Sequence, residues 1–556
     1  MPTSWRSRSR ALRVLLALLV VFSGAGAAAQ TDPVAVALAD ILGESRHPWL
    51  RRPLLRDQQE SLREIYRPRE HAPLWLEGAR PTRQAAAAVA ELAAANRKGL
   101  DPADYDAALL ERKRIALASG RVAPAEELAR FEAALSIASL RLLSDLHVGR
   151  LNPSNVAYGL DAERHVVEIA TRLPAAVESG RIRELIDEMD PEYVMYRRLL
   201  RALARVRALA ADASWRPVRF QETLHPGDES DAVPDLARNL ALLGDLPEEA
   251  ARPDTRYTGP LVDALRRFQT RHGLDPDGVI GPRTSRALAV PPAARVRQIE
   301  LSLERFRWIP DLLDARFVIV NVPACELRAR ESRSEPGEPA LSMRVVVGKA
   351  GRTPTPVFIA QMRTLVFRPY WNVPRSITVK EMLPKIRRDL GYLAEQHMEI
   401  VERGGPNVLP ATPHSVARLA AGTARLRQRP GSDNALGRVK FLLPNRYSVY
   451  LHDTPFPGIF QKSRRDFSHG CIRLEDPVGL TNWVLRDRPE WTPDATAAAM
   501  AGTEETRVPL RDRIFVIVFY TTVIVRSDDT IWFFDDIYRH DAKLERALAD
   551  GERNPP

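Results

Sequence analysis

The apolar residues of the chain change their spacing near residue 315, and this change most constrains the fold. Up to about Ala213, apolar residues recur three or four positions apart, as in "YRRLLRALARVRALAA". That spacing is typical of amphipathic helices. From Ala315 onward, segments such as "ARFVIVNVPACELRAR" are short and rich in Val and Ile, which is typical of strands. The sequence therefore predicts a helical part followed by a β-rich part.

The chain is too long for one hydrophobic core. With 556 residues it is expected to divide into several domains, because single cores stop growing well below this length. We expect a multi-domain α+β protein with a mixed β-sheet domain. The expected parts are a leader at 1–29, a helical scaffold at 32–215, a small three-helix unit at 218–290, the β-sheet domain at 300–540 with a helical capping insertion at 377–432, and a C-terminal tail at 541–556.

The first 29 residues have the pattern of a secretory signal peptide. Four arginines precede an apolar run at 14–22, and a small-residue stretch ends at Ala29. This order of charged, apolar and small residues is that of a Sec-type signal with cleavage after Ala29. We therefore expect export. If the segment were not cleaved, it would instead tether the protein to the membrane.

The charge of the chain favours an anionic surface as partner. The formal net charge is +10, which suits lipid headgroups or an acidic wall polymer. The sequence contains no basic helix interleaved with aromatic residues and no zinc-finger spacing, so nucleic acid is not an expected partner. No pattern of cofactor binding is present, and we expect no cofactor.

The unit at 218–290 has two helical segments around the turn-rich "GLDPDG". Its glycines and Asp-Gly pair allow a tight loop between helices. This stretch resembles the small peptidoglycan-binding module. The matching residues are Phe268, Gln269, His272, Gly273, Leu274, Asp277, Gly278, Ile280, Gly281, Thr284 and Leu288. The alternative is a helical spacer that does not bind sugar.

Cys471 is the candidate reactive group. It lies in "FSHGCIRL", two residues after His469 and 19 after His452. A thiol has an ordinary pKa of about 8.5 and becomes a nucleophile when a base takes its proton. One alternative is a disulfide with Cys325, the other cysteine of the chain. Others are an inert buried thiol, or a zinc site in which Asp453 or Asp476 adds a ligand to Cys471, His452 and His469.

The stretch "SVYLHDTPFPGIFQKSRRDFSHGCIRLEDP" resembles the active-site segment of the YkuD-type L,D-transpeptidases. Fifteen residues, 453–467, separate its first histidine from the Ser-His-Gly-Cys motif. Three further segments, "FRPYWNVPRSI", "RQRPGSDNALGRVKFLLPN" and "DDIYRHD", are similar to the large multi-domain Gram-negative branch of that family. The resemblance covers nearly the whole chain after residue 29.

The resemblance implies roles for nine residues. Cys471 would be the nucleophile and His452 the general base. His469, Gly470 and Tyr450 would support the site where the oxyanion forms. Arg473 would hold a carboxylate of the substrate, since arginine binds carboxylates through two hydrogen bonds. The remaining substrate-groove residues would be Trp371, Asn372 and Ser468.

The resemblance also implies a reaction. A periplasmic enzyme would take a donor tetrapeptide stem of peptidoglycan, form a thioester and pass the acyl group to an acceptor stem, giving a 3→3 cross-link. Such an enzyme serves cell-wall biogenesis and cell shape and is a carbapenem target. Glycan polymerases and D,D-carboxypeptidases are candidate partners. The residues leave two alternatives open: an L,D-hydrolase with the same Cys-His pair, or a non-catalytic wall-binding scaffold.

Overall fold

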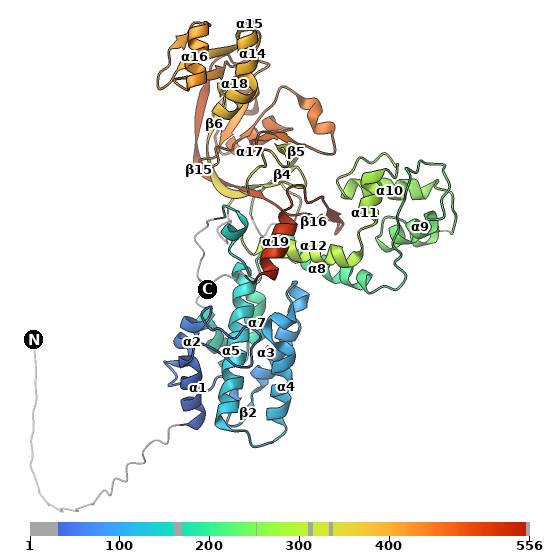
Figure 1. Cartoon of the computed structure of the whole chain (residues 1–556), viewed down its shortest axis with the longest axis vertical. Coiled ribbons are helices and arrows are strands. Elements are labelled where there is room, and N and C mark those ends of the chain that lie inside the picture. Colours follow the sequence, from blue (N-terminus) through green and yellow to red (C-terminus); the bar gives the residue numbers. More distant parts are fainter. Residues whose placement is uncertain (1–31, 161–168, 252, 310–314, 333–336, 552–556) are drawn as a thin grey trace, which may run out of the picture.

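The computed structural model describes residues 32–160, 169–251, 253–309, 315–332 and 337–551. The expected signal peptide at 1–29 lies outside these residues. In Figure 1 the helical part lies at one end of an elongated molecule, the β-sheet domain lies towards the other end, and the small helical module projects sideways. Five separate apolar clusters lie in these parts, so each region has a core of its own.

The helical part is built around α5 (Ala125–Val148). Half of its residues are Leu, Ala or Ile, and most of its residues are buried, because the neighbouring helices surround it. The other elements are α1 (Pro33–Gly43), α2 (Gln59–Tyr66), β1 (Leu76–Glu77), β2 (Arg80–Pro81), α3 (Arg83–Ala93), η1 (Ala95–Lys98), η2 (Pro102–Tyr105), α4 (Ala107–Ala118), η3 (Pro153–Val156), α6 (Ile169–Glu178), α7 (Ile182–Glu188) and α8 (Val194–Ala210).

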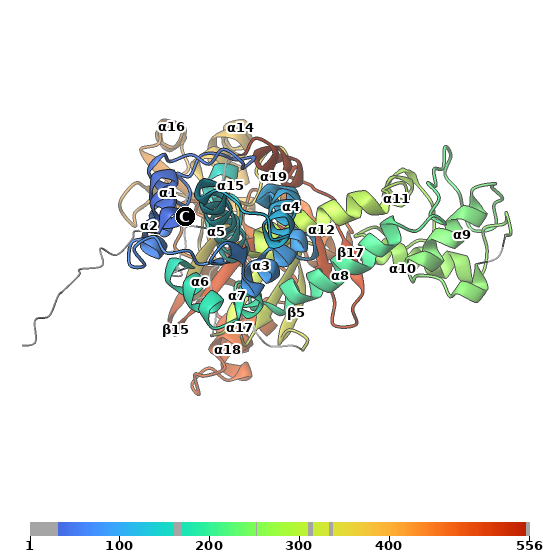
Figure 2. The same ribbon diagram turned by 90° about the horizontal axis from the view of Figure 1, so that it is seen from below.

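The small module is inserted between two helices that pack together. Its elements are α9 (Val233–Leu242), η4 (Glu248–Ala250), α10 (Pro260–Arg271) and α11 (Pro282–Leu288). The chain then returns along α12 (Pro292–Phe306), which packs against α8. In Figure 2 the module extends from the far end of these two helices. The expected three-helix unit is confirmed.

A buried carboxylate joins α12 to the helical part. Glu304 is fully buried and pairs with Arg150 and Arg307. Burial alone would raise the pKa of Glu304, but the two arginines hold it below its ordinary value. Its carboxylate also accepts the backbone N–H of Leu151 at 3.3 Å. This contact fixes the junction between the helical part and the sheet domain.

Replacing Glu304 by alanine is expected to destabilise this junction by about 3–5 kcal/mol, because two buried guanidinium groups would lose their carboxylate. Thermal unfolding followed by circular dichroism measures the shift. The exposed Glu60, which pairs with Arg63 at the surface, provides a control, and Glu60→Ala is expected to shift the transition little. Equal midpoints for the two variants would contradict the structural role of Glu304.

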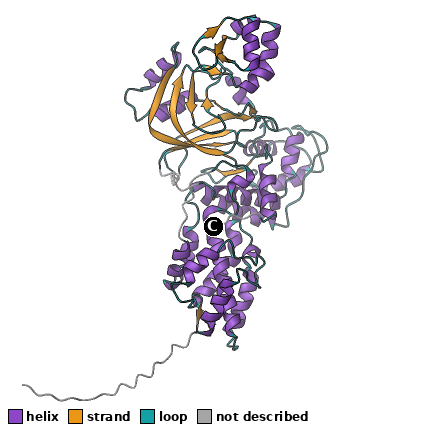
Figure 3. Cartoon of the chain, turned by 60° about the vertical axis from the view of Figure 1, so that its left-hand side comes forward, coloured by secondary structure: helices purple, strands orange, loops and turns teal. Residues whose placement is uncertain are grey.

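The β domain is a mixed sheet that closes on itself. In the described residues its order is β13-β5-β14-β12-β11-β6-β15-β3-β4, and β4 also pairs with β5. Figure 3 shows these strands as one curved layer above the helices. The strands are β3 (Phe317–Asn321), β4 (Glu326–Arg330), β5 (Leu341–Gly348), β6 (Phe358–Phe367), β11 (Val439–Leu442), β12 (Leu451–His452), β13 (Asp466–Ser468), β14 (Ile472–Leu474) and β15 (Thr506–Phe519). The predicted mixed sheet is confirmed.

The insertion differs from the helical one expected at 377–432. It contains a four-stranded sheet in the order β7-β10-β8-β9 beside its helices. Helix α16 ends at Ala421 and is capped by Gly422, whose left-handed backbone stops the helix before the next strand. The elements are β7 (Trp371–Asn372), α13 (Arg375–Ile377), η5 (Thr378–Met382), α14 (Leu383–Arg388), α15 (Gly391–Glu395), β8 (Met398–Glu402), β9 (Val408–Leu409), α16 (Pro413–Ala421) and β10 (Ala424–Gln428).

The end of the chain is folded where a tail was expected. Helix α19 (His540–Ala549) begins there, and Asp541 pairs with the buried Arg305 of α12. The remaining elements of this part of the chain are η6 (Pro457–Gln461), α17 (Pro477–Leu485), α18 (Pro493–Ala501), β16 (Val523–Val525) and β17 (Ile531–Phe533). No helix in the described part of the chain is both long and apolar enough to cross a membrane.

Candidate active site

Two short strands bring the predicted Cys-His pair to one face of the sheet. β12 and β14 are parallel neighbours, with Leu451 opposite Ile472 and His452 opposite Arg473. Leu451 and Ile472 are both fully buried on the core side. Because side chains alternate along a strand, His452 and Arg473 point to the other face. The same alternation directs Cys471 to that face.

The thiol of Cys471 is free and partly buried. Its Sγ atom lies 3.9 Å from the carbonyl oxygen of Ser448. Burial raises the pKa of the Cys471 thiol, whereas hydrogen bonds from Tyr450 and the charges of Lys440 and Arg473 act in the opposite direction. The thiol is therefore held protonated until a base acts on it. Cys325 is also free and is buried, so the alternative disulfide is absent.

His452 is poised to accept a proton at one nitrogen. Its Nδ1 lies 2.6 Å from the carbonyl oxygen of Asp453. Because a carbonyl only accepts, Nδ1 must carry the hydrogen, and Nε2 is left as the basic atom of the neutral ring. Burial, assisted by the charge of Arg473, lowers the pKa of His452 to about 3.

Cys471 comes directly before β14, and Arg473, two residues later, lies opposite His452 of β12. The two side chains therefore belong to neighbouring segments of the sheet. The described residues include no hydrogen bond between the His452 ring and the sulfur. The ring instead lies beside Tyr450, 5.7 Å between centroids. A side-chain rotation is therefore needed to bring the imidazole onto the thiol.

The turn before Cys471 is held by its own side chains. Gly470 has φ +114°, a left-handed conformation that favours glycine. Its N–H donates to the hydroxyl of Ser468, and that hydroxyl in turn donates to the carbonyl of Cys471. The hydroxyl of Thr355 donates to the carbonyl of Gly470 at 2.8 Å. Ser468, predicted to line the substrate groove, is buried and organises the turn instead. The Gly470 N–H is already used and is not free for an oxyanion.

His469 faces away from this turn towards the capping insertion. Its Nε2 lies 2.7 Å from a carboxylate oxygen of Glu381 in η5, and both side chains are about half exposed. The contact joins the motif loop to the insertion. Glu381 was not among the predicted residues, because nothing in sequence links positions 88 residues apart.

Lys440 is a site residue that the sequence analysis missed. It lies on β11 directly opposite His452, so the two side chains share one face of the sheet. Its ammonium is 5.4 Å from the centre of the Tyr450 ring. Burial lowers the pKa of Lys440, while Glu505 and Cys471 act to raise it. The available signal was the alternation in "VKFL", where the neighbours Val439 and Phe441 are fully buried.

The substrate-groove residues are divided between two parts of the domain. Arg473 lies on the face that carries Cys471, and its buried Nε has no hydrogen-bond partner among the described residues. Trp371 and Asn372 instead form β7 of the insertion, where they pair with β10. The structure therefore brings Cys471, His452, Tyr450 and Arg473 together, and leaves Trp371 and Asn372 on the insertion.

The histidines do not converge with Cys471 as zinc ligands would. The Nδ1 of His452 is occupied by a backbone carbonyl, and His469 is bound to Glu381. Within the described ranges, no group of three or more His, Cys, Asp or Glu residues could hold a metal ion. The arrangement instead offers a thiol, a neutral imidazole and two cationic side chains on one face, which suits acyl transfer through sulfur.

Comparison with known protein families supports the division of the chain into a helical part, a small helical module and a catalytic domain. Residues 315–510 match the family model described as an L,D-transpeptidase catalytic domain. Residues 229–288 match a putative peptidoglycan binding domain, and residues 60–203 match a scaffold domain. A putative L,D-transpeptidase of Haemophilus influenzae is 31% identical over 251 residues, which are 45% of this chain and 49% of the relative. The chain thus spans about half the length of the curated relative it matches.

Proposed function

We propose that the protein is a periplasmic enzyme that makes 3→3 cross-links in peptidoglycan, because residues 315–510 match an L,D-transpeptidase catalytic domain and residues 229–288 match a putative peptidoglycan binding domain. The observation that carries the proposal is the placement of Cys471, His452 and Arg473 on one face of the sheet by the β12–β14 register. The signal-like residues 1–29 support export to the periplasm.

The proposed reaction begins at the sulfur. Nε2 of His452 takes the thiol proton, and the thiolate attacks the amide carbonyl of the diaminopimelate residue in a donor tetrapeptide. The amide C–N bond breaks, and D-alanine leaves with the proton that His452 returns. The amine of an acceptor stem then attacks the thioester, its proton passes to His452, and the thiol is released. A neutral His452 can accept the first proton because it is unprotonated at neutral pH.

Water in place of the amine would give an L,D-hydrolase from the same acyl-enzyme. Incubation with a purified disaccharide-tetrapeptide separates the two outcomes. Cross-linked dimers in the mass spectrum are the expected result. Tripeptide without dimer would favour hydrolysis, and unchanged tetrapeptide would oppose both enzymatic readings in favour of a wall-binding scaffold. Glycan polymerases and D,D-carboxypeptidases remain proposed partners, tested by co-purification.

Arg473 is proposed to bind a carboxylate of the donor stem. Its half-buried guanidinium faces the thiol, and its Nε lacks a partner among the described residues. Arg473→Ala is expected to lower kcat/KM for the tetrapeptide by about 10- to 100-fold, because a charge-assisted hydrogen bond contributes about 1.5–3 kcal/mol. Steady-state kinetics measures this change. Arg473→Lys retains charge and is expected to recover part of the loss; equal activity in all three proteins would contradict the role.

Lys440 is proposed to favour the thiolate. Burial raises the pKa of Cys471, and the ammonium of Lys440 opposes that effect. Lys440→Met is therefore expected to raise the thiol pKa further and to slow iodoacetamide alkylation at pH 8 by about 3- to 10-fold, because only the thiolate reacts. Rates measured across pH should shift their inflection upward. Lys440→Arg keeps the positive charge and is the matched control. A Lys440→Met profile that coincides with that of the unsubstituted protein would refute this role.

A further inference from the structure

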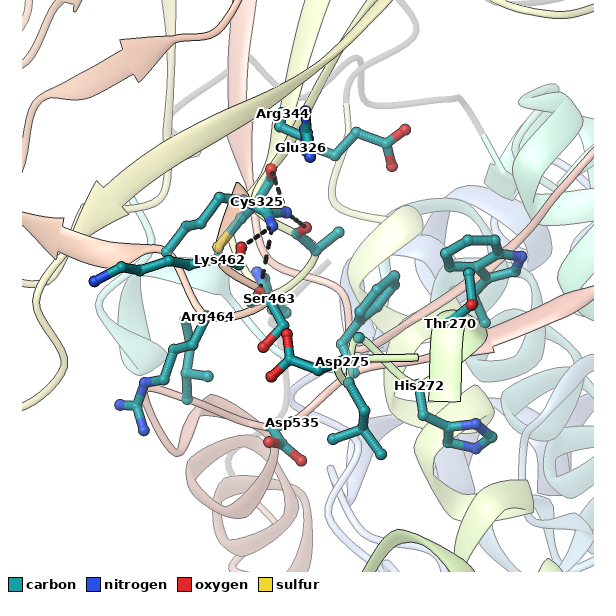
Figure 4. Close-up of a pocket in the computed structure, with 18 of the residues that line it drawn as sticks. Thr270, His272, Asp275, Cys325, Glu326, Arg344, Lys462, Ser463, Arg464 and Asp535 are labelled. Carbon is teal, nitrogen blue, oxygen red and sulfur yellow. Dashed lines mark hydrogen bonds between the residues drawn. The ribbon is translucent and has the colours of Figure 1, made fainter. Parts of the chain in front are cut away.

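A cavity lies where the small helical module meets the catalytic domain. Its volume is about 480 Å³, within the range of small-ligand sites. One wall comes from Thr270 near the end of α10 and from residues 272–276, which follow that helix. The other walls come from 323–326, 342–344 and 461–466 of the catalytic domain. Figure 4 shows Asp275 on the module side near Ser463, and Lys462 at the edge of the lining with its ammonium directed away from Asp275.

The wall formed by 461–466 is held rigidly by Arg465. Its guanidinium donates to the carbonyls of Lys462 and Ser463 in its own loop, and to those of Ala324 and Cys325 after β3. Figure 4 draws these hydrogen bonds as dashed lines. Arg283 reaches across from the module to the hydroxyl of Ser463, 3.3 Å away. The cavity is therefore bounded by groups that are fixed before any ligand enters.

Most charges in the lining neutralise one another. The recorded pairs are Glu326–Arg526, Glu475–Arg344, Asp466–Arg464 and Asp535–Arg283. Arg465 pairs with no carboxylate either, but backbone carbonyls hold its guanidinium. Among the described residues of the lining, two charged side chains have neither an ion pair nor a hydrogen bond: the carboxylate of Asp275 and the ammonium of Lys462. The ammonium lies instead over the ring of Phe467, 5.3 Å from its centre. The unmatched charges are thus one anion on the module and one cation on the catalytic side.

We propose that this cavity is a second peptide site, which binds a zwitterionic segment of a wall stem peptide between Asp275 and Lys462. A free amine of the ligand would pair with Asp275, and a free carboxylate would pair with Lys462. The two unmatched charges indicate that the ligand is a zwitterion. The identification of this ligand as wall peptide rests on the proposed function. A stem that contains a diamino acid carries both groups, whereas the N-acetylated glycan carries no free amine.

The position of the cavity connects this ligand to the catalytic loop. Asp466 and Glu475, which line the cavity, flank Cys471 by five residues before and four after. Lys462 leads directly towards β13 and the Ser-His-Gly-Cys motif. A stem bound here would hold a second wall strand beside the reaction without occupying the sulfur. The small helical module would then hold a stem peptide beside the catalytic domain, in addition to any contact that the module makes with glycan.

The test uses the full chain with Cys471→Ala, so that binding is measured without turnover. The probes are a soluble disaccharide-tetrapeptide, the same compound with its free amine acetylated, and the same compound with its carboxylates amidated. Isothermal titration gives the affinity for each. Lys462→Gln and Asp275→Asn are each expected to lower the affinity for the unmodified probe by about 5-fold or more, which is the effect of losing one charge pair. Arg266→Gln, an exposed residue of α10 outside the lining, is expected to leave affinity unchanged.

The pairing of variant with probe makes the test specific. Asp275→Asn should not alter binding of the acetylated probe, and Lys462→Gln should not alter binding of the amidated probe. The second site would be overturned if no binding were measurable. It would also be overturned if Asp275→Asn lowered the affinity for the acetylated probe, or Lys462→Gln the affinity for the amidated probe, as much as for the unmodified one. Dimer formation by the Lys462→Gln and Asp275→Asn proteins with Cys471 intact reports separately on the proposed function, which can stand if this inference fails.

Discussion

Cys471→Ala is expected to abolish cross-linking, with a loss of at least about 10⁴-fold in rate, because the proposed acyl-enzyme cannot form without its nucleophile. The fold should be unchanged, since Cys471 is only partly buried and its thiol makes only weak contacts: the Ser448 carbonyl lies 3.9 Å away, and Tyr450 hydrogen-bonds to the sulfur. The measurement is the rate of dimer formation from disaccharide-tetrapeptide, followed by mass spectrometry. Circular dichroism confirms that the variant is folded.

Cys325→Ala is the matched control. That thiol is buried in the β3–β4 turn, and burial raises its pKa to about 11. It is therefore protonated at neutral pH and is expected to have no part in the reaction. Cross-linking should persist in this variant. Retention of activity by Cys471→Ala, or its loss in Cys325→Ala with the fold intact, would contradict the assignment of the nucleophile.

His452→Gln is expected to lower the acylation rate by about 10²- to 10⁴-fold, the usual contribution of a positioned general base. Glutamine can retain a hydrogen bond to the carbonyl of Asp453, which now accepts from Nδ1 at 2.6 Å, but it cannot take the thiol proton. Single-turnover acylation by the tetrapeptide measures this step. Because burial lowers the pKa of His452 to about 3, the ring should remain an available base throughout pH 5–8.

His469→Gln separates the two histidines of the motif. His469 pairs with Glu381 on the exposed side of the loop, so its substitution should slow acylation far less than His452→Gln. The reverse order of effects would show that His469 is the base and would require the motif loop to turn inward. Rates within 10-fold of the unsubstituted protein for His452→Gln would remove that residue from the mechanism.

The sequence could predict the parts that depend on local pattern. The helical periodicity before residue 213, the three-helix module and the mixed sheet are confirmed. The pairing of His452 with Cys471 in catalysis stays a prediction; the structure places them on neighbouring segments, since β12 and β14 pair directly and Cys471 comes just before β14. These features follow from the spacing of apolar residues and from the turn residues, and both can be read in a single sequence.

The remaining features depend on contacts between distant segments. Lys440 joins the site only through its register opposite His452, and a lone lysine in a strand carries no other signal. Ser468 was expected to face substrate, but its neighbours Gly470 and Cys471 supply backbone partners for its hydroxyl. The strands β8 and β10 of the insertion were missed because each pairs with a segment more than 20 residues away. Helix periodicity alone cannot reveal such pairing.

The most direct test of the account is to trap the acyl-enzyme. The protein is mixed with the tetrapeptide donor, quenched in acid and analysed by intact and tandem mass spectrometry. The account predicts a mass gain equal to the donor less D-alanine, located on Cys471 and discharged when an acceptor amine is added before the quench. Dimer formation without any adduct on Cys471, or an adduct on a different residue, would contradict it.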